Sequence, residues 1–249
     1  MSVLSVAHFE HVRDGRLEVL VRAELRAKLL PLLRAAGDDF ADAAVVRVPG
    51  GRGATVAVRA EGEHFAIRAG RRGGLPGRLV SSLYFGFDPR PFREIAVTAE
   101  LHKHGVPVVE PCAAAVRWVL PGVYRSWLVT RWVEDARTLW AWAAFERDRM
   151  RRESVFVAIG RALLALHDAG ATHPDLNLNN ILVRERDGRP EILLLDFDRA
   201  RPPTASVDGA ADFGRLRRSA RKLDPAGVVV AAAELDLIEA TGRAHAPVR

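Results

Sequence analysis

Cysteine is almost absent from this 249-residue chain, since Cys112 is the only one. A single cysteine excludes an internal disulfide and fits a protein that works in a reducing compartment. No second thiol lies at the spacing of a metal ligand, so the sequence indicates neither a redox centre nor a cysteine metal site. We expect Cys112 to be a buried structural thiol.

Long apolar segments are missing as well. An uninterrupted run such as Val228 to Ala233 is far shorter than the roughly 20 residues that a transmembrane helix needs. The first 15 residues lack a basic region followed by a long apolar stretch, so they do not have the pattern of an export signal. We therefore expect a cytoplasmic protein without a transmembrane helix.

Lysine is scarce although the chain is basic. Only Lys28, Lys103 and Lys222 are lysines among 37 basic residues, and 31 acidic residues leave a formal net charge of +6. An excess of positive charge favours contact with phosphates, nucleic acid or anionic membranes. A genome rich in arginine and alanine codons explains the same composition. The charge thus supports a polyanionic partner but does not identify it.

The first half of the chain has the pattern of β-strands. Turn residues separate apolar segments at 45–48, 55–59, 64–68, 114–120 and 124–132. Such runs predict an antiparallel, five-stranded lobe. Residues 90–104 have apolar residues at helical spacing and are followed by Gly105, which predicts a helix with a glycine cap. Residues 20–36 also have helical spacing, although Pro31 interrupts it.

The second half is mainly helical. Helical spacing predicts helices at 138–145, 153–169, 212–223 and 227–240. Strands at 181–184 and 191–195 flank a turn at Asp187-Gly188, which predicts a hairpin. The fold class is therefore α+β: one domain over residues 1–249, with a strand-rich lobe at 1–134 and a short, mainly helical lobe at 135–249. Two such lobes are the architecture of the protein-kinase-like fold.

Three polar residues of the second half have the order and spacing of a kinase active site. His173-Pro174-Asp175-Leu176, followed by Asn180, has the H-x-D-L-x-x-x-N pattern of a catalytic loop. Asp196-Phe197-Asp198 follows the hairpin, where kinases have D-F-G. A lone loop Asp or Asn is usually a turn former, but turn formation does not explain this order. Phosphoryl transfer needs a base, metal ligands and aligned phosphates, and these residues can supply the first two.

The strand-rich lobe offers a phosphate clamp. Kinases carry a lysine in the V-A-I-K pattern of the third strand, and this chain has Phe65-Ala66-Ile67-Arg68 there. The guanidinium of Arg68 suits the α and β phosphates of ATP, with Glu94 of the helix as its partner. The alternative is a surface arginine on an edge strand.

Two glycine-rich segments belong to the same lobe. Gly50, Gly51 and Gly53 lie between strands, where backbone N–H groups can approach phosphates, although a tight turn explains them equally. Residues 69–88 lack helical or strand period and should form an exposed basic loop. The arginines of this loop that we consider for substrate contacts are Arg71, Arg72 and Arg78.

The peptide-binding part of a protein kinase is missing from the sequence. No A-P-E motif follows Asp196, and only about fifty residues remain after it. A protein substrate is accordingly disfavoured.

Longer segments extend these motifs: IRAGRRGGLPGRL at 67–79, RPFREIAVTAELHKHGVPVVEP at 90–111, LHDAGATHPDLNLNNILV at 166–183 and LLLDFDRAR at 193–201. With them the sequence resembles the 3-deoxy-D-manno-octulosonic acid (Kdo) kinases of the lipopolysaccharide kinase family, from about residue 45 to 223. Many small-molecule kinases share the catalytic loop. The Arg-Arg-Gly-Gly element and the Asp-Phe-Asp-Arg ending are more particular to this family.

Members of that family phosphorylate the 4-hydroxyl of Kdo attached to lipid A, at the cytoplasmic side of the inner membrane. The resemblance implies ATP and Mg²⁺ as cofactors, Asp175 as base and Asn180 and Asp196 as Mg²⁺ ligands, with Arg68 and Glu94 as the phosphate clamp. It also implies Kdo-lipid A as substrate and peripheral attachment to the anionic inner membrane. No nucleic acid partner is expected.

Two alternatives remain at the level of sequence. One is a kinase for another small acceptor, such as a lipopolysaccharide heptose or an aminoglycoside-like sugar. The other is a pseudokinase that only binds, which is disfavoured because Asp175, Asn180 and Asp196 are all retained.

Overall fold

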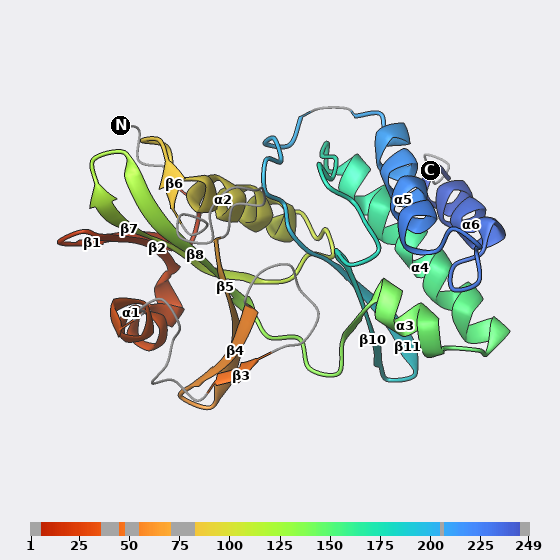
Figure 1. Cartoon of the computed structure of the whole chain (residues 1–249), viewed down its shortest axis with the longest axis horizontal. Coiled ribbons are helices and arrows are strands. Elements are labelled where there is room, and N and C mark those ends of the chain that lie inside the picture. Colours follow the sequence, from red (N-terminus) through yellow and green to blue (C-terminus); the bar gives the residue numbers. More distant parts are fainter. Residues whose placement is uncertain (1–5, 36–44, 48–54, 71–82, 205–206, 245–249) are drawn as a thin grey trace. The chain divides into compact units, whose positions relative to one another are not determined.

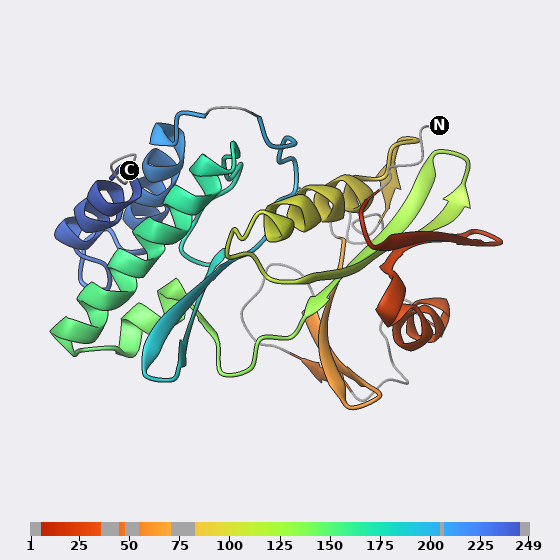
Figure 2. The same cartoon turned by 180° about the vertical axis from the view of Figure 1, so that it is seen from behind.

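The computed structural model describes residues 6–35, 45–47, 55–70, 83–204 and 207–244. Internal contacts divide the chain into two compact units. The first unit comprises Met1–Ala99 and Glu110–Trp132, and the second comprises Glu100–Val109 and Val133–Arg249. Figures 1 and 2 show these units from opposite sides, one built on a sheet and one built mainly of helices.

An antiparallel sheet forms the centre of the first unit. Its strands follow the order β1-β2-β7-β8-β5-β4-β3, and β6 pairs with β8 outside this path. The bounds are β1 Phe9–Asp14, β2 Leu17–Arg22, β3 Val45–Arg47, β4 Thr55–Ala60, β5 Glu63–Ala69, β6 Tyr84–Phe85, β7 Pro111–Leu120 and β8 Val123–Arg131.

The prediction of five strands for this lobe was wrong in number, because the described residues of the first unit form eight. The five predicted strands are present as β3, β4, β5, β7 and β8. The prediction missed the hairpin of β1 and β2, whose turn contains Gly15 at a φ of +58°. Residues 17–21 are buried without alternation, so their sequence lacks the period of a half-exposed strand. Strand β6 has only two residues, too few to show any period.

Helix α1 (Arg26–Ala35) begins later than the predicted helix over residues 20–36. The segment up to Arg22 is strand β2, and a short 3-10 turn at Ala23–Leu25 leads into the helix. Pro31 lies inside α1 and removes one backbone donor. Burial of the leucines at positions 29, 30 and 33 offsets that loss.

Apolar side chains cover both faces of the sheet. In β2, Val19 and Val21 join a cluster with the leucines of α1, whereas Leu20 joins another cluster with Phe92 and Ile95 of helix α2 (Arg90–Lys103). Neighbouring residues of a strand point to opposite faces. Helices α1 and α2 therefore cover opposite faces of the sheet (Figures 1 and 2).

The predicted end of α2 is confirmed. Gly105 has a φ of +75°, and its N–H donates to the carbonyl of His102 at 3.0 Å. Positive φ is accessible to glycine without steric cost, so Gly105 closes the helix.

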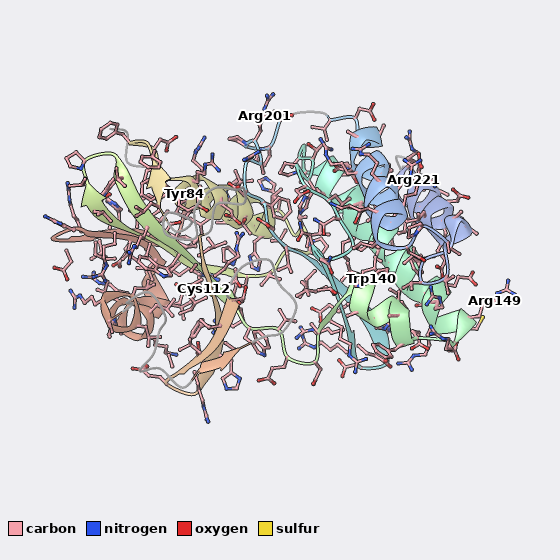
Figure 3. All side chains as sticks on the ribbon, in the orientation of Figure 1. Tyr84, Cys112, Trp140, Arg149, Arg201 and Arg221 are labelled. Carbon is pink, nitrogen blue, oxygen red and sulfur yellow. The ribbon has the colours of Figure 1, made fainter. Side chains whose placement is uncertain are left out.

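Cys112 is fully buried in β7, as expected for a structural thiol (Figure 3). Burial raises the pKa of this thiol to about 12. A thiol with such a pKa forms almost no thiolate at neutral pH, which makes it a poor nucleophile.

The described residues of the second unit form four helices and a small sheet. The helices are α3 Leu139–Phe145, α4 Arg149–Asp168, α5 Ala210–Leu223 and α6 Ala232–Gly242, and the strands are β9 Arg137–Thr138, β10 Ile181–Arg186 and β11 Arg189–Leu194. The predicted hairpin is confirmed, since β10 pairs with β11. Asp187 and Gly188 both have positive φ, as a type I′ turn requires.

Helix α6 begins five residues later than the predicted residue 227. The carboxylate of Asp224 accepts hydrogen bonds from the N–H groups of Val228, Val229 and Val230, at 2.7 to 3.0 Å. These contacts hold the three valines in a loop, and the helix follows it.

The longest helix, α4, has 20 residues but carries charged side chains along its length. Within the described ranges, no helix combines the length and apolarity needed to cross a bilayer.

Candidate active site

Residues 173–180 form a loop between α4 and β10, which we call the HPD loop. Two side chains fix its backbone: the amide groups of Asn177 and Asn180 both donate to the carbonyl oxygen of Asp175, each at 2.9 Å. The side chain of Asp175 itself is exposed. The loop therefore holds the backbone of Asp175 rigidly and leaves its carboxylate accessible.

The imidazole of His173 lies beneath this loop and is fully buried. Its Nδ1 accepts a hydrogen bond of 3.2 Å from the Asp175 N–H. Its Nε2 lies 2.7 Å from the carbonyl oxygen of Leu195. A carbonyl oxygen can only accept, so Nε2 carries the hydrogen and donates this bond. Burial lowers the pKa of His173 below the ordinary 6.5. The neutral ring thus links the HPD loop to the residue before Asp196.

Asn180 and Asp196 are brought together by the backbone. The Leu195 N–H donates to the Asn180 carbonyl at 2.9 Å, so the residue next to Asp196 is bonded directly to Asn180. Asp196 has a φ of +64°, a region that few residues other than glycine adopt. The ring of Phe197 is buried and lies 4.7 Å from the His173 ring. Packing of Phe197 and bonding of Leu195 hold the unusual backbone of Asp196 from both sides.

Helix α5 anchors the HPD loop at two points. The carboxylate of Asp212, which is fully buried, accepts from the His173 N–H at 2.9 Å, and it also contacts His167 at 3.0 Å and Arg215 at 2.8 Å. Seven residues further along α5, the hydroxyl of Ser219 accepts from the Leu178 N–H at 3.2 Å. Both ends of the loop are therefore bonded to one helix.

Sequence reasoning missed Asp212 and Ser219. A signal was present, because Asp212, Leu216 and Ala220 recur at intervals of four and are all buried. An acidic residue on the apolar side of a helix has to find a polar partner in the interior. That pattern could have identified Asp212 as a buried anchor, although not the group that it binds.

In the first unit, Arg68 of β5 contacts Glu94 of α2. The guanidinium lies 2.5 Å from the carboxylate, and Glu94 is buried whereas Arg68 is half-exposed. Strand β5 lies between β4 and β8, so Arg68 is not on an edge strand. The hydroxyl of Thr98 binds the backbone carbonyl of Glu94 at 2.8 Å. Glu94 thereby fixes the position of the Arg68 guanidinium. That this guanidinium binds phosphates stays a prediction.

Several predicted site residues lie outside the described residues. These are Gly50, Gly51, Gly53, Arg71, Arg72 and Arg78. Their roles remain predictions from the sequence.

Asn180 and Asp196 have the donor chemistry that Mg²⁺ requires. The Asn180 amide nitrogen is used in the bond to Asp175, so its side-chain oxygen is the group that could coordinate a metal together with the carboxylate of Asp196. Among the described residues, no three His, Cys, Asp or Glu side chains gather as a complete metal cage. Mg²⁺ prefers few protein oxygens and fills its other positions with water and substrate phosphates. The two oxygens therefore fit this ion.

Comparisons with known proteins agree with the motif. A sequence profile described as "Lipopolysaccharide kinase (Kdo/WaaP) family" matches residues 40–241. The chain is 36% identical to the 3-deoxy-D-manno-octulosonic acid kinase of Photobacterium profundum, over 68% of this chain and 70% of that protein. It is 34% identical to the enzyme of the same description from Actinobacillus succinogenes, over 64% and 66% of the two chains.

Among solved structures, the chain is similar to one described as WaaP in complex with acyl carrier protein. The TM-score is 0.57 at 15% sequence identity, over 90% of this chain and 88% of that one. This likeness concerns the fold, which is the kinase-like fold of WaaP. The profile spans most of the chain, and the chain therefore belongs to the lipopolysaccharide kinase (Kdo/WaaP) family.

Proposed function

We propose that this kinase transfers the γ-phosphate of ATP to the 4-hydroxyl of Kdo in Kdo-lipid A, during synthesis of the lipopolysaccharide inner core. One observation carries the proposal: the HPD loop holds Asp175 and Asn180 in place and is bonded to Leu195, next to Asp196. Identity of 34 to 36% to Kdo kinases supports the choice of acceptor.

Asp175 is the general base in this proposal. Its backbone N–H and carbonyl are both held by the loop, while the carboxylate reaches solvent. A carboxylate so positioned can accept the proton of the acceptor hydroxyl as the new P–O bond forms. Fixing the backbone lowers the entropy cost of alignment.

Asn180 and Asp196 would hold Mg²⁺ through one amide oxygen and one carboxylate. Such an ion would supply positive charge to offset the charge of the nucleotide phosphates during transfer. The bond from the Leu195 N–H to the Asn180 carbonyl supports this pairing, because it holds the residue before Asp196 next to Asn180.

The lobe of residues 1–134 would bind the nucleotide, and the lobe of 135–249 would carry the chemistry. Glu94 orients the guanidinium of Arg68, which can then donate two N–H groups to phosphate oxygens. Backbone N–H groups around Gly50, Gly51 and Gly53 would complete the phosphate site. Arg71, Arg72 and Arg78 would contact the anionic acceptor, and the protein would attach peripherally to the inner membrane.

The decisive experiment supplies ATP and Mg²⁺ with Kdo-bearing lipid A and, in parallel, with lipid A that lacks Kdo. Mass spectrometry should show one added phosphate only on the first substrate, and NMR should place it on the 4-hydroxyl. The Asp175→Asn protein is the control for contaminating kinases. A third reaction supplies a heptose-bearing lipopolysaccharide acceptor. Phosphate on its heptose would instead assign the alternative acceptor, and transfer to neither sugar would refute the proposed substrate.

A further inference from the structure

Five apolar residues gather at one end of the sheet of the first unit. They surround the turn between β7 and β8, and we call them the hairpin-tip patch: Phe85, Phe87, Val119, Leu120 and Val123. Phe87 is 68% exposed, Leu120 62% and Phe85 55%. Large apolar side chains that are exposed singly need no explanation, but a contiguous group marks an interaction surface.

Strand register shows that three residues of the patch lie on one face. Phe85 is paired with Val123, and Val123 with Leu120, so the three residues form a row across β6, β8 and β7. Phe87 covers Gly122 at the turn, where an added Cβ would lie 3.1 Å from its ring. The row and the turn therefore form one continuous apolar surface.

The opposite face of the same hairpin is covered by aromatic side chains of the protein itself. Tyr124 is buried there, stacked on Tyr84 at 5.7 Å and packed edge-on against Trp118 at 5.3 Å. Tyr84, the first residue of β6, is labelled in Figure 3. Aromatic packing on that side fixes the hairpin, so exposure of the patch does not result from a loose strand end.

The charges around the patch are positive. Arg16 is exposed and donates to the carbonyl of Val119 at 3.3 Å. Arg125 follows Val123 by two positions in β8, and alternate residues of a strand share a face. The acid that follows Phe87, Asp88, is paired with Arg93 at 3.2 Å. Apolar and aromatic residues flanked by arginines complement an anionic bilayer surface.

We propose that the hairpin-tip patch docks this kinase on an anionic lipid bilayer, with the apolar residues in the headgroup region and Arg16 on lipid phosphates. This inference rests on the proposed function in one respect: a lipid-anchored acceptor must be met at a membrane. A second copy of the chain is a poorer occupant. Stable interfaces use about 20–30 residues on each side, and a symmetric contact would bring like charges together.

The experiment measures sedimentation of the full chain with vesicles of phosphatidylethanolamine and phosphatidylglycerol, and with vesicles of phosphatidylcholine alone. The double variant Phe87→Ser, Leu120→Ser should bind the anionic vesicles about tenfold more weakly or worse, because partial burial of each side chain contributes to partitioning. Arg16→Gln keeps a donor for Val119 and should weaken binding only to the anionic vesicles. Phe145→Ser is the matched control, an aromatic residue that is 75% exposed in the second unit.

Three results would overturn the proposal: no binding of the wild-type chain to anionic vesicles, equal binding of the double variant, or a dimer that the double variant dissociates in light scattering. Transfer to detergent-dispersed Kdo-lipid A is measured separately and should be the same for wild type and variants. If wild type binds vesicles through the patch but transfers no phosphate, the docking surface stands and the proposed function fails.

Discussion

The carboxylate of Asp212 accepts a hydrogen bond of 2.9 Å from the backbone N–H of His173, 39 residues earlier in the chain. The acid is fully buried, and it also contacts His167 and Arg215. The first residue of the HPD loop is thereby tied to helix α5. The HPD loop of the candidate active site is therefore held in place by a hydrogen bond in the interior of the second unit.

Replacing Asp212 should destabilise the fold. Asp212→Ala leaves the His173 N–H and Arg215 without their acceptor, and breaking a buried charged network costs about 3–5 kcal/mol. Denaturant titration should show this loss in the free energy of unfolding. Asp236→Ala is the control, because that carboxylate pairs with Arg217 at the surface and should contribute under about 1 kcal/mol. Equal losses in the two variants would contradict the anchoring role.

Ser219 should affect turnover more than stability. Ser219→Ala removes one hydrogen bond to Leu178, worth about 1 kcal/mol, but releases the end of the HPD loop. We expect a lower kcat with little change in KM for ATP, and recovery in Ser219→Thr, which keeps the hydroxyl. Arg218→Ala, at an exposed position of the same helix, is the control. A change in KM alone would argue against a positioning role.

Asp175→Asn and Asp196→Asn should each remove most activity while the fold persists. The first loses the base and the second a metal carboxylate, and positioned acid–base groups contribute roughly 10² to 10⁴-fold. Initial rates of ADP formation measure the effect, with circular dichroism as the folding check. Asn179→Ser, at an exposed position of the same loop, should retain activity. Near-wild-type turnover in either aspartate variant would refute the assigned site.

Arg68 and Glu94 should be energetically coupled. Arg68→Ala should lower kcat/KM strongly, and Arg68→Lys should restore it only in part, because lysine lacks the bidentate fork. Removing Glu94 leaves the guanidinium without the carboxylate 2.5 Å away. A double-mutant cycle with Glu94→Ala should therefore be non-additive. Simple additivity would show that the pair does not act as one clamp.

Stability should fall in mild acid because of His173. Burial holds its pKa below 6.5 in the folded protein, so the unfolded chain takes up the proton first as the pH drops. Stability rises with pH wherever the unfolded state binds more protons. The free energy of unfolding should therefore decrease below about pH 6.5, and this part of the decrease should vanish in His173→Gln. The exposed His102→Gln variant should follow wild type; an unchanged pH profile in His173→Gln would exclude this explanation.

Local chemistry made several elements readable from the sequence. The Asp187-Gly188 turn and the Gly105 cap both require a positive φ. Glycine adopts this backbone conformation readily, and Asp-Gly is a favoured pair for such a turn. The order of His173, Asp175, Asn180 and Asp196 likewise indicated kinase chemistry, because such a site needs a base and oxygen ligands at fixed intervals. These features depend on neighbours in the chain.

Other features were decided only by tertiary structure. Residues 17–21 form a strand because β1 and β7 pair with them from either side, and Tyr84-Phe85 form one because β8 offers an unpaired edge at that point. The bond of Asp212 to His173 joins segments far apart in sequence. Apolar period and turn chemistry are local, whereas strand partners and the acceptor of a buried N–H depend on which segments meet in space. The sequence alone thus indicated which functional groups this kinase uses, and the tertiary structure decided which strands and hydrogen bonds hold those groups in place.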